Sequence, residues 1–217
     1  MNPIPERYTR TAIALHWLIA FLILATVPLG VYMSDLPLSP DKLKFYSWHK
    51  WIGITVLILA ILRLLWRGSH LPPRLPDLTP RWQRLARDTV HLLLYFLLFA
   101  VPLSGWIMSS AKGFQTVWFG VLPLPDLVGK DKALGQLLTT LHRGLNLVLV
   151  ALVATHVAAA VKHHFIDRDA TLQRILPFGK EFNYGYWAAL LRSAGRGTAD
   201  WFVERSLRHR IQAGSHR

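Results

Sequence analysis

Four long apolar segments alternate with shorter polar segments along the chain, and each is long enough to cross a lipid bilayer as a helix. We expect membrane-spanning helices at about 11–33, 45–65, 88–109 and 138–162. Proline, serine and charged residues mark the connections between them. The pattern predicts an all-α membrane protein, a four-helix transmembrane bundle with up-down topology.

The first apolar segment has an alternative interpretation as the hydrophobic region of a cleaved signal peptide, because Arg7 and Arg10 precede it. However, it is longer than such regions usually are, and it lacks a suitable cleavage site. It also carries His16, which a discarded peptide would not need. We therefore interpret it as the first span, and we expect Pro28 to kink or end this helix.

The overall composition indicates that lipid is a second solvent for this chain. Hydrophobic residues make up 52% of its 217 residues and charged residues only 17%, whereas soluble domains carry about 25% charged residues. The absence of cysteine excludes disulfides, iron–sulfur clusters held by thiolates and cofactors attached through cysteine. Histidine is therefore the strongest soft metal ligand that the sequence offers.

The formal net charge is +13, which in a soluble protein would suggest a nucleic-acid partner. Here the basic residues lie between apolar segments, so topology and anionic lipid headgroups explain them, and no nucleic acid is expected. Eighteen of the 25 Lys and Arg residues fall in the N-terminal segment, the connection between the second and third spans, and the C-terminal tail. The positive-inside rule then places both termini in the cytoplasm.

Five of the ten histidines lie within the predicted spans, namely His16, His49, His91, His142 and His156. His142 and His156 are fourteen residues apart, so on one helix they share a face and differ in depth by roughly 21 Å. The predicted topology puts His49 and His142 toward the periplasm and the other three toward the cytoplasm. Two pairs at equal depth follow, His49 with His142 and His16 with His156, although depth alone leaves His91 as a competitor of His16.

Ionisable side chains inside a bilayer are costly and usually functional. A haem with two axial imidazoles needs one histidine from each of two facing helices at one depth, and the chain offers this arrangement twice. We therefore interpret four residues as the iron ligands of two non-covalent haems b: His16, His49, His142 and His156. The alternatives are core histidines bonded across helices, a zinc site, which would need three or four converging ligands, and a haem-free transporter or scaffold.

Other residues near these two depths are candidates to contact haem or quinone. Gly53 shares a helix face with His49 and provides the low relief that a porphyrin needs, although small residues also serve ordinary helix packing. His91 is a candidate to bind a quinone carbonyl, or to pack. Four cations are candidates to pair with haem propionates or to anchor the helices at the interface: Lys50, Arg143, Arg10 and Lys162.

The spans with their histidines resemble the bacterial cytochrome b561 family. The matching segments, within residues 7–178, are RYTRTAIALHWL, WHKWIGITVLILAILRLLWR, ARDTVHLLLYFLLFAVPLSGW and LHRGLNLVLVALVATHVAAAVKHHFIDRD. The resemblance implies a four-helix bundle with two haems b and the same two histidine pairs. It also implies electron transfer between the periplasmic side of the bacterial inner membrane and the quinone pool, with oxidation of superoxide in some members.

We therefore expect a quinone-linked transmembrane oxidoreductase, with reduction of ubiquinone by periplasmic superoxide as the activity that the resemblance suggests. The alternative is a haem b anchor subunit that relays electrons from a periplasmic dehydrogenase or hydrogenase to quinone. Residues 1–178 would form the cytochrome domain, and residues 179–217 a basic cytoplasmic tail to which the sequence assigns no role.

Overall fold

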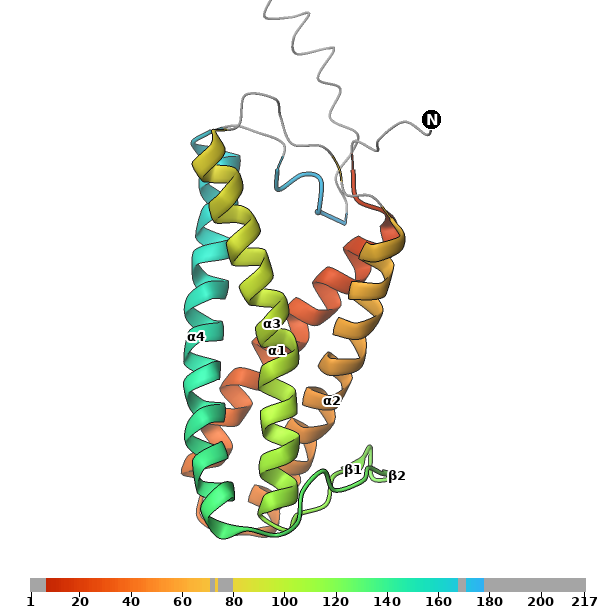
Figure 1. Ribbon diagram of the computed structural model, residues 1–217, viewed down its shortest axis with the longest axis vertical. Helices are drawn as coiled ribbons and strands as arrows, with labels where there is room; N and C mark the ends of the chain where they lie inside the picture. Colours follow the sequence, from red (N-terminus) through yellow and green to blue (C-terminus); the bar gives the residue numbers. More distant parts are fainter. Residues whose placement is uncertain (1–6, 71–72, 74–79, 168–170, 178–217) are drawn as a thin grey trace, which may run out of the picture. The chain divides into compact units, whose positions relative to one another are not determined.

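The structure is a computed structural model that describes residues 7–70, 73, 80–167 and 171–177. In these ranges the chain forms four long helices: α1 (Arg10–Asp35), α2 (Pro40–Ser69), α3 (Arg81–Ala111) and α4 (Lys132–Phe165) (Figure 1). All four are long and apolar enough to cross a membrane, which confirms the fold expected from the hydropathy pattern. The predicted tail 179–217 lies outside the described residues.

Side-chain caps set where three of the helices begin. Thr9, Ser39 and Asp131 each accept a hydrogen bond from the backbone N–H three residues later, at 3.2, 3.2 and 3.0 Å, which satisfies a donor that the first helical turn leaves unpaired. Pro40 is the first residue of α2, where its missing N–H costs nothing. The helices therefore extend beyond the predicted apolar spans into the polar sequence on either side.

Pro28 does not end the first helix, because α1 continues through it to Asp35. A second proline, Pro102, lies inside α3 in the same way. In a membrane helix, neighbouring helices and side-chain hydroxyls satisfy the carbonyl that loses its N–H partner, so an interior proline is tolerated.

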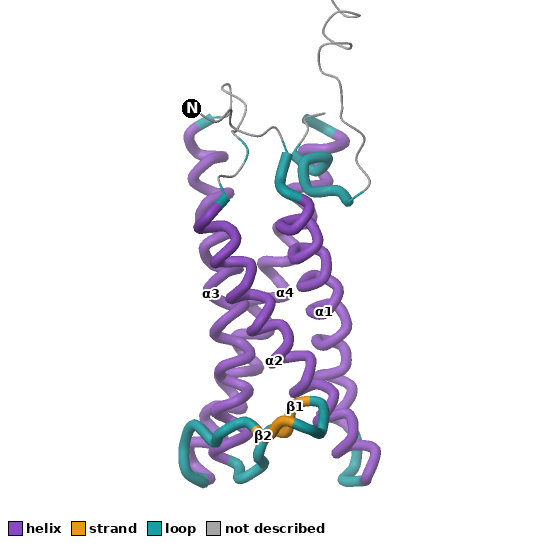
Figure 2. The backbone as a smooth tube through the Cα atoms, turned by 90° about the vertical axis from the view of Figure 1, so that its right-hand side faces the viewer, coloured by secondary structure: helices purple, strands orange, loops and turns teal. Residues whose placement is uncertain are grey.

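The helices pack in sequence order, α1 on α2, α2 on α3 and α3 on α4 (Figures 1 and 2). The buried core lies among the first three helices and is formed by Ile19, Val56, Ala60 and Leu98. Helix α4 lies close to α3 but approaches neither α1 nor α2 closely. Contacts of α4 with α1 and α2 are therefore made by side chains across a wider separation between the helices.

A short hairpin lies beside α2, near the end of the helices predicted to face the periplasm, called the outer end below; the opposite end, with the start of α1, is the inner end. Strands β1 (Val117–Trp118) and β2 (Leu122–Pro123) pair antiparallel in the connection from α3 to α4 (Figure 2). The indole of Trp51 donates to the carbonyl of Val117 at 2.6 Å. The hairpin is thus fastened to α2, close to His49.

Candidate functional site

His49 of α2 and His142 of α4 face each other at the outer end, with ring centroids 6.3 Å apart and ring planes at 81°. Nδ1 of His49 is hydrogen-bonded to the Thr26 hydroxyl at 3.2 Å. Nδ1 of His142 lies 2.9 Å from the Ser104 hydroxyl and 3.1 Å from the Val101 carbonyl. Ser104 donates its own proton to that carbonyl, so Nδ1 of His142 must carry a proton. Its Nε2 therefore keeps a lone pair for a metal.

His16 of α1 and His156 of α4 face each other near the inner end, with ring centroids 6.4 Å apart and ring planes at 69°. A third imidazole, His91 of α3, lies 5.2 Å from His156. Nδ1 of His91 donates to the Arg87 carbonyl at 2.7 Å, which leaves Nε2 of the neutral ring as an acceptor. A neutral His91 therefore cannot donate from Nε2 to a quinone carbonyl; it would have to be protonated first.

The spacing of the two pairs fits one metal ion between each pair of rings. A metal–imidazole bond of about 2 Å on each side of one ion puts the two ring centroids roughly 6.3 Å apart. The observed separations are 6.3 Å and 6.4 Å, whereas the 5.2 Å between His91 and His156 is too short. The distances therefore favour His16 over His91 as the partner of His156, and the residues present fit two bis-histidine haems.

Two glycines make room for the outer rings. A Cβ atom added at Gly30 of α1 would lie 2.9 Å from Cε1 of His49, and one added at Gly105 of α3 would lie 3.1 Å from Cε1 of His142. Both distances are shorter than an ordinary van der Waals contact. Sequence reasoning missed both glycines, although Gly30 follows His16, and Gly105 follows His91, by the same fourteen residues that separate His142 from His156.

Within the described ranges, no group of three or more His, Cys, Asp and Glu side chains is arranged to hold a metal ion. A structural or catalytic zinc site would need three or four such ligands at one point. The arrangement in pairs at two depths therefore favours haem over zinc.

Comparison with known proteins agrees with this geometry. Residues 7–178 match the family model described as prokaryotic cytochrome b561. The chain belongs to this family. It is 38% identical to cytochrome b561 homolog 2 of Escherichia coli strain K12 over 174 residues, which cover 79% of this chain and 92% of the relative. It is 29% identical to cytochrome b561 homolog 1 of the same organism over 175 residues, covering 79% and 98%.

A more distant relative carries a functional name. The chain is 27% identical over 178 residues to the probable superoxide oxidase CybB of Yersinia pestis, and the match covers 79% of this chain and 97% of the relative. Membership of the cytochrome b561 family makes transmembrane electron transfer the general function of the chain and implies that it binds haem b.

Gly53 and Lys50 of this cytochrome b561, both predicted to lie beside the outer haem, have different surroundings in the structure. A Cβ atom added at Gly53 would meet nothing within 4 Å, so this part of α2 has the low relief that a porphyrin needs. The Lys50 ammonium is turned toward the hairpin connection, where it donates to the Gln115 carbonyl at 3.1 Å and to the Ser109 hydroxyl at 3.3 Å. Lys50 thus joins α2 to the hairpin connection, and its donors are not directed at the histidine pair.

The other predicted cations of the cytochrome lie near the two ends. Arg143 and Arg10 are exposed, and Lys162 forms an ion pair with Asp167 at 2.6 Å. At the outer end, burial and then the positive charge of Arg143 hold the pKa of Lys112 below its usual value. The proximity of Lys112 and Arg143 gives this end a local positive field, whereas the ion pair of Lys162 supports an anchoring role.

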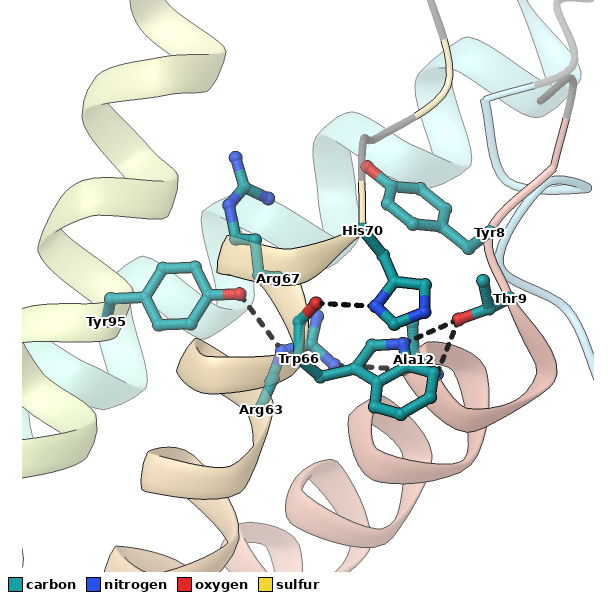
Figure 3. A pocket seen from close by; sticks show the side chains of 8 residues that line it. All are labelled: Tyr8, Thr9, Ala12, Arg63, Trp66, Arg67, His70 and Tyr95. Atoms are coloured by element: carbon teal, nitrogen blue, oxygen red, sulfur yellow. Dashed lines mark hydrogen bonds between the residues drawn. The ribbon is translucent and has the colours of Figure 1, made fainter. Parts of the chain in front are cut away.

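The inner end of the cytochrome also holds a small pocket that sequence reasoning did not anticipate (Figure 3). Its walls include Arg63, Trp66 and Arg67 of α2 and Tyr95 of α3. The Trp66 indole donates to the Thr9 hydroxyl at 2.8 Å, which fastens the end of α2 to the start of α1. The pocket therefore places two guanidinium groups beside the inner end of the bundle.

Proposed function

We propose that this cytochrome b561 carries electrons across the bacterial inner membrane through two haems b. His49 and His142 would bind the outer haem, and His16 and His156 the inner one. The proposal rests on one observation, two pairs of imidazoles with centroid separations of 6.3 Å and 6.4 Å, about four helical turns apart. When bound, the iron porphyrin supplies reversible one-electron chemistry.

The protein around the pairs is suited to electron transfer. The two imidazoles at each depth would both bind the iron of the haem held there, which would leave no coordination site for O₂ activation. Hydrogen bonds at the outer Nδ1 atoms fix the orientation of those rings. Between the two depths, the core of Ile19, Val56, Ala60 and Leu98 excludes water, which keeps the two sites separate within one bundle.

We further propose quinone as the partner in the lipid phase and superoxide as a donor at the outer face. The name of the Yersinia relative supports superoxide. Lys112 and Arg143, which lie close enough to interact electrostatically, would attract a small anion to this face. Purified haem-loaded protein should then be reduced by superoxide and reoxidised by ubiquinone. Rates that do not fall as salt is added would contradict the electrostatic part of this proposal.

The alternative role is that of a haem b anchor subunit for a periplasmic dehydrogenase or hydrogenase. It predicts that a large redox partner co-purifies with the cytochrome in mild detergent. It also predicts that haem reduction requires that partner. Rapid reduction by superoxide in the purified single chain would exclude the need for such a partner.

The haem assignment is tested by counting haem per chain in single variants. Reduced-minus-oxidised spectra of the wild type should show b-type bands for two haems. His16→Ala, His49→Ala, His142→Ala and His156→Ala should each lose one haem. His91→Ala is the matched control, because it removes a histidine from a span without removing a proposed ligand, and it should keep both. Two haems in any of the four ligand variants, or one haem in the wild type, would refute the assignment.

A further inference from the structure

The fourteen-residue spacing recurs in all four helices and builds two layers of different chemistry. Fourteen residues bring a helix through nearly four whole turns, so both positions point to one side. At the outer layer these positions hold two histidines and two glycines: Gly30, His49, Gly105 and His142. At the inner layer they hold three histidines and an arginine: His16, Arg63, His91 and His156.

The structure holds the Arg63 guanidinium at the inner layer. Its Nη1 donates to the Ala12 carbonyl at 3.2 Å, one helical turn before His16. Its Nε donates to the Tyr95 hydroxyl at 3.2 Å, one turn after His91. Figure 3 shows Arg63 between these two partners. The side chain therefore bridges α1 and α3 at the depth of the inner histidine pair.

No carboxylate neutralises this charge within the part of the chain that the structure describes. The three ion pairs found there join Arg87 to Asp88, and Lys162 and His163 to Asp167. Arg63 also lies close enough to act electrostatically on all three inner imidazoles. A half-buried positive charge thus lies near the place where the inner iron would gain an electron.

We propose that Arg63 raises the reduction potential of the inner haem and so makes the inner site the acceptor for electrons from the outer site. This inference depends on the two-haem function proposed above. In the transfer, one electron leaves the outer iron, which goes from ferrous to ferric, and enters the inner iron, which goes from ferric to ferrous. Arg63 stabilises the product because the electron moves toward a fixed positive charge, and the residue itself neither gains nor loses a proton.

The outer pair has no cation at the corresponding positions, where α1 and α3 carry glycine. Two cations lie toward the outer pair: Lys50, whose ammonium is bound to the hairpin connection, and Lys112, which lies beyond the end of α3 and acts electrostatically on His142. Lys112 is exposed, whereas Arg63 is half-buried, so solvent screens the charge of Lys112 more strongly. The two layers therefore differ in electrostatics in the direction that draws electrons inward.

The size of the effect follows from Coulomb's law. A unit charge at a separation on the order of 10 Å, in an effective dielectric of about 20, changes a one-electron equilibrium by roughly 15-fold. Arg63→Gln should therefore lower the equilibrium constant for reduction of the inner haem by at least tenfold. This change corresponds to a fall of about 59 mV in its midpoint potential. Arg63→Lys keeps the charge and should shift the potential by less than half of that amount.

The test is a spectroscopic redox titration of the purified haem-loaded full chain, fitted with two one-electron transitions. Haem is counted first, so that a chain with fewer than two haems counts against the proposed function and not against the role of Arg63. Arg84→Gln is the matched control, because Arg84 is an exposed cation on the same end of the bundle. It should leave both potentials unchanged.

The expected result is that the midpoint potential of one transition falls in Arg63→Gln and in Arg63→Met. The potential of this transition should be largely restored in Arg63→Lys and unaffected in Arg84→Gln. Two bound haems with neither potential shifted would overturn the proposal while leaving the two-haem function intact. Equal shifts of both transitions would also overturn it, because the effect would then not be specific to the inner site. Loss of one haem from both neutral variants, with retention in Arg63→Lys, would assign Arg63 to cofactor retention instead.

Discussion

Replacing Gly30 by alanine should weaken binding of the outer haem, because the new methyl group would occupy the space of a proposed ligand. The added Cβ would lie 2.9 Å from Cε1 and 3.4 Å from Nδ1 of His49. To restore an ordinary contact, the ring must move by roughly 0.5 Å. The ring has little freedom to do so, since Thr26 holds its Nδ1 at 3.2 Å and His142 faces it with a centroid separation of 6.3 Å.

The magnitude comes from two opposing effects. Disturbing the residues that orient a metal ligand typically lowers metal affinity by about 10- to 100-fold, which corresponds to roughly 1.4–2.8 kcal/mol. Alanine is also a better helix former than glycine by about 1 kcal/mol, which offsets part of the strain that the new contact causes in the haem-free protein. Gly30→Ala should therefore weaken the free energy of haem binding by more than it lowers the free energy of unfolding of the haem-free protein.

The assay is the rate of haem transfer to an excess of a haem-scavenging protein, together with haem content per chain. Gly144→Ala is the control, because Gly144 is exposed, lies in α4, and has nothing within 4 Å of an added Cβ. Gly105→Ala should have a smaller effect than Gly30→Ala, since its Cβ would lie 3.1 Å from His142 Cε1. Equal haem retention in Gly30→Ala and Gly144→Ala would refute the reasoning that Gly30 confines a ligand.

Three other measurements test other parts of the structure. Trp51→Phe removes the 2.6 Å hydrogen bond to the first strand of the hairpin; it should cost about 1 kcal/mol of local stability and speed amide hydrogen exchange in the hairpin, and unchanged exchange would contradict this. Arg143→Gln removes a positive charge that lowers the pKa of Lys112; that pKa should rise, so the amine should be acylated more slowly at a fixed alkaline pH. His156→Ala, which keeps the outer pair, should bind its remaining haem about tenfold more tightly than His142→Ala does, because hydrogen bonds pre-orient the outer rings; equal affinities would contradict this.

The helical fold was predictable because apolar length and a fixed rise of about 1.5 Å per residue leave few alternatives. The same regularity gives the depth of each histidine once the direction of each helix is assumed. The structure brings together the rings that depth matches, His49 with His142 and His16 with His156. Their role as iron ligands stays a prediction until haem is counted.

Depth alone did not reveal what surrounds each ring, because that depends on how each helix is rotated about its axis. Gly30 and Gly105 matter only because they face an imidazole of another helix. Lys50 was a candidate to pair with a propionate or to anchor its helix at the interface. Successive residues lie about 100° apart on a helix, and the Lys50 side chain turns to the hairpin connection. Of the two outcomes expected at Pro28, a kink or the end of the helix, the second is wrong, because α1 continues to Asp35.

The position of Arg63 in the structure indicates that its charge is functional. A guanidinium near the end of a membrane helix can extend to the interface, where its charge is hydrated at little cost. Arg67, one turn further along α2, is exposed in this way. Arg63 instead donates to Ala12 and Tyr95 and stays half-buried. Because a charge partly withheld from water raises the free energy of the protein unless a nearby group offsets it, this arrangement favours negative charge at the inner layer. The electron and propionates of a haem held by His16 and His156 would supply that charge, whereas a haem-free scaffold would leave Arg63 with only its neutral partners, Ala12 and Tyr95.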